Sequence, residues 1–104
     1  MATVKVCAGV CGFITTIYTE SEDMQEVAIK IESDCSHIMA MGSELDKVDG
    51  YQECFAQIGD GEVYKIARKC CKHAACPVPS AIIKAIEVAC GLALPRDVEF
   101  KICG

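Results

Sequence analysis

The pattern of hydrophobic and polar residues in the first third of the chain is typical of strands, in three segments: residues 3–7, 13–19 and 25–32. The first two are rich in β-branched and aromatic residues, and the third alternates as in a half-buried strand. The third places Val27, Ile29 and Ile31 on one face and charged residues on the other. The polar residues 20–23 fit a hairpin connection between the second and third segments. The pattern therefore predicts three strands that form an antiparallel meander.

The spacing of apolar residues then changes to that of helices. Helices are expected over residues 36 to about 46, 50–57, 61–71 and 81–90. Asp34 or Ser36 is expected to cap the first helix and Asp60 the third, because short polar side chains accept hydrogen bonds from free N–H groups at helix starts.

After the last helix the strand-like alternation returns, with Val98, Phe100 and Ile102 at every second position. A final strand is expected here, which gives the order βββααα(α)β. Because strands and helices are segregated, the prediction is an α+β domain over residues 1–104. In it, helices would cover one face of a three- to four-stranded antiparallel sheet.

Composition and charge narrow the function classes. With 104 residues, 52 % of them hydrophobic, the chain suits one domain with one core. A net charge of −5 argues against nucleic acid as a partner, and the basic residues Lys65, Arg68, Lys69 and Lys72 are interpreted as a solvated helix face. The C-terminal apolar stretch is interrupted by charged residues, so no membrane association is expected. The chain start lacks the pattern of a secretory signal, which favours a cytoplasmic location.

Nine cysteines are the unusual feature of the composition. An odd number of them in a chain expected in a reducing compartment argues against a disulfide framework. Several must therefore serve as small hydrophobic residues. Cys90 lies on an apolar helix face and is expected in the core, and Cys7, Cys54 and Cys103 are expected to be similar.

Three other cysteines stand at predicted element boundaries, namely Cys11, Cys35 and Cys76. Thiols at turns and helix starts are open to chemistry, since a helix start favours the thiolate form. Asp34, next to Cys35, acts in the opposite direction. If the three thiols meet in the fold, they would form a site for a soft metal or for sulfur handling.

A fourth ligand could come from the local string CCKHAAC, which contains Cys70, Cys71, His73 and Cys76. Cys70 continues an inward apolar stripe and is expected in the core. For Cys71, core packing and metal ligation stay open, and His73 fits either a surface histidine or a ligand. The predicted metal site is thus Cys11, Cys35 and Cys76 with His73 or Cys71, binding zinc or an iron–sulfur cluster.

The order of these motifs resembles the NifU/IscU scaffold family, in which three such cysteines hold a nascent iron–sulfur cluster on an α+β domain. Cys11-Gly12, Cys35 and Cys76 match the three cysteine positions, over about residues 5–90. The resemblance implies an IscU-like fold and a sulfur-donor or cluster-acceptor protein as partner. Phe13 stands where that family has an aspartate, and His73 is three residues from Cys76 instead of adjacent to it. The stretches CGF, SDC and HAACPVPSAI also resemble a small uncharacterised cysteine-containing family of anaerobic archaea and clostridia.

Three function classes follow. The first is a metal- or iron–sulfur-cluster-binding module. The second is a persulfide or sulfur-transfer protein with Cys35 as the reactive thiol. The third is a non-catalytic interaction domain whose thiols reflect a reducing habitat, and it predicts an exposed apolar patch. Enzyme catalysis has the least support, and the sequence leaves the metal and the oligomeric state open.

Overall fold

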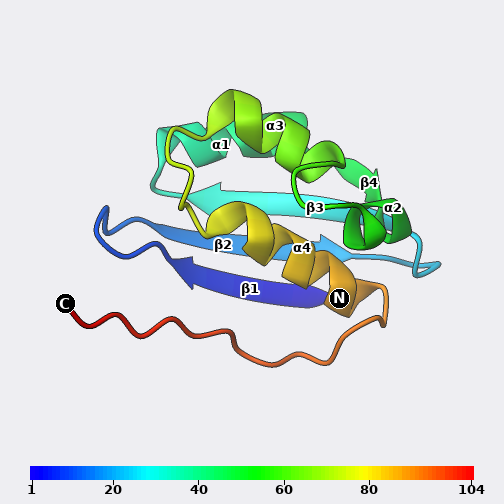
Figure 1. Cartoon of the computed structure of the whole chain (residues 1–104). Helices are drawn as coiled ribbons and strands as arrows, with labels where there is room; N and C mark the ends of the chain where they lie inside the picture. Colours follow the sequence, from blue (N-terminus) through cyan, green and yellow to red (C-terminus); the bar gives the residue numbers. More distant parts are fainter.

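Four antiparallel strands form one sheet, in the order β1-β2-β3-β4, in the computed structural model of residues 1–104 (Figure 1). The strands are β1 (Ala2–Cys7), β2 (Ile14–Glu20), β3 (Glu26–Ser33) and β4 (Lys47–Asp49). The first three are the predicted meander, with boundaries within one residue of those expected. β1 pairs with β2 only, so its outer edge is free of any strand.

Four helices cover one face of this sheet (Figure 1). They are α1 (Ser36–Glu44), α2 (Gly50–Phe55), α3 (Glu62–Cys70) and α4 (Val78–Ala89). Helix α4 packs on β1 and β2, α1 packs on β3, and α3 contacts both α1 and α4. No helix combines the length and apolar character needed to cross a membrane. The predicted α+β class, with helices on one face of an antiparallel sheet, is confirmed.

The core lies between the two layers and follows the period-2 pattern of the strands. Val27, Ile29 and Ile31 all point inward, as predicted, and Ile31 pairs with the fully buried Ile17 of β2. The buried Thr19 hydroxyl donates a hydrogen bond of 2.8 Å to the Ala85 carbonyl of α4. This bond satisfies a buried polar group and joins the sheet to the helical layer.

Two predictions about strands were wrong or incomplete. The expected last strand does not form: Val98, Phe100 and Ile102 belong to an extended C-terminal segment without regular structure. A strand needs a hydrogen-bonded neighbour, and no strand of this chain pairs with that segment. Strand β4 was not predicted, because three residues between two helices are too few to show a periodic pattern.

The start of α3 also differs from the prediction. Asp60 does not cap the helix; the N-cap position is Gly61, which has no side chain to accept a bond. The carboxylate of Glu53, only 6 % exposed, accepts hydrogen bonds from the N–H groups of Glu62 (2.9 Å) and Val63 (2.8 Å). A side chain from α2 therefore satisfies the free donors of the next helix.

Replacing Glu53 by alanine is expected to lower the free energy of unfolding by about 2 kcal/mol, because two N–H groups, one of them buried, lose a charged acceptor. Urea unfolding followed by circular dichroism measures the change. Glu62→Ala is the matched control: this exposed neighbour makes only a surface ion pair with Lys65 and should change stability by less than about 0.5 kcal/mol. Equal effects of the two substitutions would contradict the capping role.

Candidate functional site

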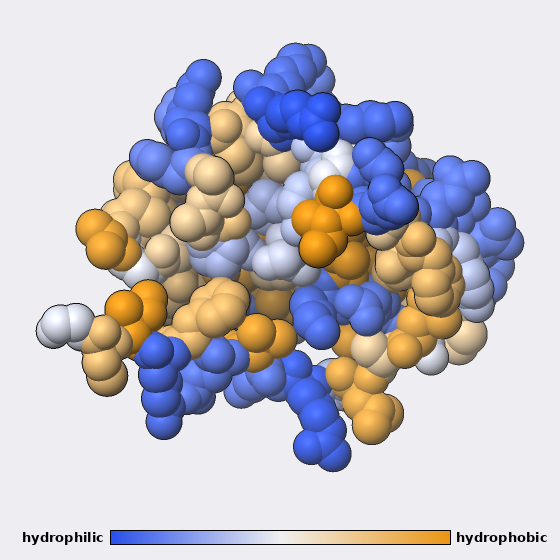
Figure 2. Space-filling view, viewed as in Figure 1, coloured by the Kyte–Doolittle hydropathy of each residue, from blue (hydrophilic) through white to orange (hydrophobic).

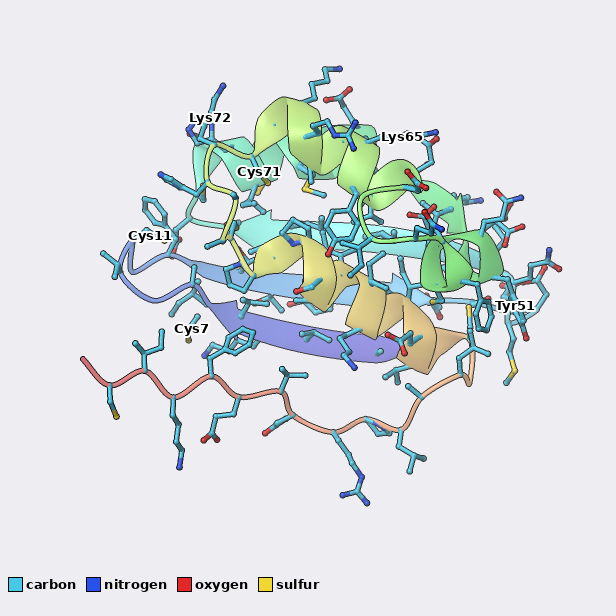
Figure 3. All side chains as sticks on the ribbon, viewed as in Figure 1. Cys7, Cys11, Tyr51, Lys65, Cys71 and Lys72 are labelled. Carbon is cyan, nitrogen blue, oxygen red and sulfur yellow. The ribbon has the colours of Figure 1, made fainter.

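One end of the sheet collects three connections that lie far apart in the sequence. Strand β1 ends where β2 begins, with Cys7 paired to Ile14. The N–H of Asp34, just after β3, donates to the Ile14 carbonyl at 3.3 Å, so the β3–α1 junction joins the same end. Figure 3 shows Cys7, Cys11 and Cys71 at this end, opposite Tyr51. The antiparallel topology thus gathers the β1–β2 turn, the start of α1 and the α3–α4 loop.

The α3–α4 loop holds two thiols against the core. Cys71 directly follows α3, and its N–H closes the helix by donating to the Ala67 carbonyl at 2.8 Å. Cys76 ends a turn in which its N–H donates to the His73 carbonyl at 3.2 Å. Both side chains are half-buried and pack on the apolar core. Backbone bonds therefore hold both residues in place.

Cys35 brings a third half-buried thiol to this end. It occupies the N-cap position of α1, and neither Asp34 nor Ser36 caps the helix, contrary to the prediction. The N–H of Cys35 donates to the Ser33 hydroxyl at 3.1 Å, which in turn shares a 2.7 Å hydrogen bond with Thr15 of β2. The neighbouring strand thus fixes the backbone of Cys35, and its thiol packs on the core.

These thiols are neighbours. The pKa of the Cys71 thiol is raised to about 11, chiefly by burial and then by the nearby thiols of Cys76, Cys70 and Cys35. Cys70 is buried, as predicted for a core residue, and its thiol donates to the Glu44 carboxylate at 3.4 Å. Burial, followed by the contact with Glu44, raises the pKa of Cys70. Cys70 is therefore occupied elsewhere, which leaves Cys35, Cys71 and Cys76 as the three thiols free to act together.

A groove of about 520 Å³ opens next to two of these thiols, with Cys71, His73 and Cys76 in its wall. Arg68 and Lys72 also line it, and no carboxylate does. Both were interpreted from the sequence as part of a solvated helix face. All four basic side chains of that face are exposed, in agreement with that interpretation, and Lys65 and Lys69 form surface ion pairs. Arg68 instead donates to the Gly59 carbonyl at 3.1 Å.

The remaining predicted ligands are less constrained. Cys11 and His73 are both exposed, Cys11 in the β1–β2 turn and His73 in the α3–α4 loop. No three histidine, cysteine, aspartate or glutamate side chains stand close enough together to hold a metal ion without rearrangement. The thiols of Cys35, Cys71 and Cys76 have the right chemistry for a soft metal, but in this arrangement they are too far apart to bind one ion together. The roles of Cys11 and His73 as ligands stay predictions.

Of the cysteines expected to be structural, Cys90 is confirmed in the core at 3 % exposure. Cys54 is half-buried, and burial, followed by the charge of Glu87, raises its pKa to about 12. Cys7 and Cys103 are exposed, so the prediction that they fill the core was wrong. Cys7 falls on the outward side of edge strand β1, and Cys103 lies in the unpaired C-terminal segment.

A second hollow, of about 320 Å³, lies beside the β2–β3 hairpin and is lined mainly by polar residues, among them Asp23, Gln25 and Asp49. Its carboxylates have structural roles. Asp23 accepts bonds from the N–H groups of Gln25 (3.0 Å) and Glu26 (2.9 Å), and these lower its pKa. Asp49 caps α2 through the N–H groups of Tyr51 and Gln52. The hollow therefore offers no free chemical group comparable to the thiols.

Comparison with known proteins gives a family but no activity. No curated protein and no solved structure matches the chain. A family profile covers residues 2–102, which include every strand, every helix and all nine cysteines except Cys103. The chain belongs to this family, described as a family of unknown function, DUF6951.

Proposed function

We propose that this protein binds a soft metal ion or an iron–sulfur cluster through the thiols of Cys35, Cys71 and Cys76. The observation that carries the proposal is that three half-buried thiols, from segments far apart in sequence, pack on the core at one end of the sheet, with Cys35 and Cys76 near enough to Cys71 to raise its pKa. Thiolates are the ligands that zinc and iron–sulfur clusters prefer. Metal binding would have to draw the three thiols together.

The charge around the groove supports a thiolate site. Three thiolates on a divalent ion carry a net negative charge, and nearby cations offset it. Arg68 and Lys72 supply two cations in the groove wall, where no carboxylate lies, although the whole chain has a net charge of −5. This placement would offset the negative charge of a thiolate–metal centre once it has formed.

Cys11 and His73 are proposed as additional ligands. Cys11 lies in the turn at the same end of the sheet (Figure 3), and His73 lines the groove with Cys71 and Cys76. The likeness of Cys11-Gly12, Cys35 and Cys76 to the cysteines of the NifU/IscU scaffolds supports a cluster over a simple ion. It also supports a sulfur-donor or cluster-acceptor protein as the partner.

The test is the metal content of protein purified without oxygen. Elemental analysis, acid-labile sulfide and a visible spectrum should show either about one zinc per chain, or iron together with a matching amount of acid-labile sulfide. Cys76→Ser should lose this metal, whereas Cys54→Ser should keep it, because Cys54 lies on α2 at the other end of the sheet (Figure 1). Metal retained by Cys35→Ser, Cys71→Ser and Cys76→Ser alike, or a protein that takes up no metal on reconstitution, would refute the proposal.

Sulfur transfer is the second candidate, and the position of Cys35 favours it. Cys35 is the N-cap residue of the nine-residue helix α1, whose first N–H groups have no side-chain acceptor. Its sulfur therefore stands at a helix start where backbone donors are free of side-chain acceptors. In this case the Cys35 sulfur would attack the outer sulfur of a persulfide donor, so that a new S–S bond forms, the donor's S–S bond breaks and the donor leaves as a thiol. Mass spectrometry should then find the persulfide on Cys35 alone, and none in Cys35→Ser.

A further inference from the structure

The C-terminal segment, residues 96–103, has the pattern of a strand but no partner. Val98, Phe100 and Ile102 alternate with Asp97, Glu99 and Lys101. The only backbone hydrogen bond formed by any of residues 96–103 is the one from the Arg96 N–H to the Leu94 carbonyl. The three apolar side chains are 62 %, 77 % and 92 % exposed. Figure 2 shows hydrophobic and hydrophilic side chains alternating along the lower rim, where this segment runs.

The outer edge of β1 is the complementary feature. β1 is the edge strand of the sheet, so half of its backbone N–H and C=O groups have no strand partner. Its inward residues Val4 and Val6 are only half-buried, although they pack on the core, and so is Ile83 of α4, the helix that packs on β1. An added strand with apolar residues at every second position would cover these three side chains.

The C-terminal segment does not pair with the free edge of β1 in its own chain. It lies along β1 and runs in the same direction (Figure 1), yet no hydrogen bond joins the two. Every other pair of neighbouring strands is antiparallel. A second copy, related by a two-fold axis perpendicular to the strands, presents its β1 in the opposite direction. The segment would then pair antiparallel with that β1, as in the rest of the sheet.

We propose that two copies of this chain form a symmetric dimer in which residues 96–103 of each pair with β1 of the other. The exchange pairs the free edge of β1 in both copies at once, and a two-fold arrangement is closed because each copy gives and receives the same segment. Val98, Phe100 and Ile102 then extend the apolar face beside Val4 and Val6. The inference does not use the thiols as ligands, although Phe100 also lines the groove beside Cys71 and Cys76 in its own chain.

Sedimentation analysis of the full chain tests the dimer. The expected mass at high concentration is twice the 11.2 kDa of one chain. Phe100→Asp should raise the dimer dissociation constant about a hundredfold or more, since it buries an unpaired carboxylate in the interface. Lys101→Asp is the matched control, with the same new side chain at an outward position, and should raise it far less. Both positions lie outside all helices and strands, so circular dichroism should show an unchanged fold.

An isotope-filtered NMR experiment on a mixture of labelled and unlabelled chains identifies the partner of the segment. Contacts between the Phe100 ring of one copy and the Val4 or Val6 methyl groups of the other are expected. A chain that stays monomeric at all concentrations would overturn the proposal. So would a dimer equally tolerant of Phe100→Asp and Lys101→Asp, or contacts found only within one copy.

Discussion

Replacing Cys71 by serine is expected to weaken the affinity for zinc or cadmium by about a hundredfold or more. A neutral serine hydroxyl is a poor ligand for a soft metal, and Cys71 is the thiol with Cys35, Cys70 and Cys76 as neighbours. Competition with a chelator under anaerobic conditions measures the affinity. Cys54→Ser, which removes an equally half-buried thiol elsewhere, should leave the affinity within about twofold of the unsubstituted value.

The pH dependence of the same affinity gives an independent check. With its pKa raised to about 11, the Cys71 thiol is protonated at neutral pH, and the metal must displace that proton. Affinity should therefore rise by about tenfold per pH unit for each displaced proton, as long as the pH stays below that pKa. Cys71→Ser should reduce the number of released protons by one. The same proton release with and without the Cys71 thiol would exclude it as a ligand.

Replacing Gly50 by alanine is expected to lower the free energy of unfolding by about 2–3 kcal/mol. Gly50 begins α2 and is buried, and its N–H donates to the Gln25 carbonyl at 2.7 Å. A Cβ atom here would overlap the sulfur of Cys90 and come within 3.1 Å of Val27. Alanine is the better helix former by about 1 kcal/mol, so only the lack of space gives the effect its sign.

A double-mutant cycle separates the steric overlap from other causes. Cys90→Ala removes the overlapping sulfur, so Gly50→Ala should cost less than about half as much in that background. Urea unfolding of the four proteins measures both costs. If Gly50→Ala lowers the free energy of unfolding by the same amount with and without the Cys90 sulfur, the overlap with Cys90 is not the reason for a glycine at this position.

Local pattern was enough for most of the fold. Alternating residues such as Val27, Ile29 and Ile31 define strands whose inner face is buried, and the structure confirms the meander and the four helices. The caps were not predictable in this way. Glu53 caps α3 although it lies nine residues before Glu62, from whose N–H it accepts a hydrogen bond. No spacing rule connects a side chain in one helix with the start of the next.

The C-terminal alternation shows the opposite case. Val98, Phe100 and Ile102 have the period of a strand, but period alone does not supply a neighbour to pair with. The fate of such a segment depends on tertiary or quaternary contacts that a single sequence does not contain. Cys7 is a different case, because the alternation that turns Val4 and Val6 inward already places Cys7 on the solvent face of β1.

Part of the candidate site could be predicted from the sequence. Cys35 and Cys76 stood out because they flank helices, and the structure places them at one end of the sheet. Whether Cys71 joined them could not be decided, because the residue just after a helix no longer follows the helical period. Its position depends on the path of the loop towards Pro77. The basic lining of the groove also needed the structure, which separates Arg68 and Lys72 from the paired Lys65 and Lys69.

The most direct measurement is the alkylation rate of each cysteine, followed by mass spectrometry under anaerobic conditions, with and without one equivalent of zinc. The proposed site predicts that Cys35, Cys71 and Cys76 become slow together when metal is added. The exposed Cys7 and Cys103 should react at unchanged rates. If Cys35, Cys71 and Cys76 react equally fast with and without metal, the three thiols do not bind a common metal ion.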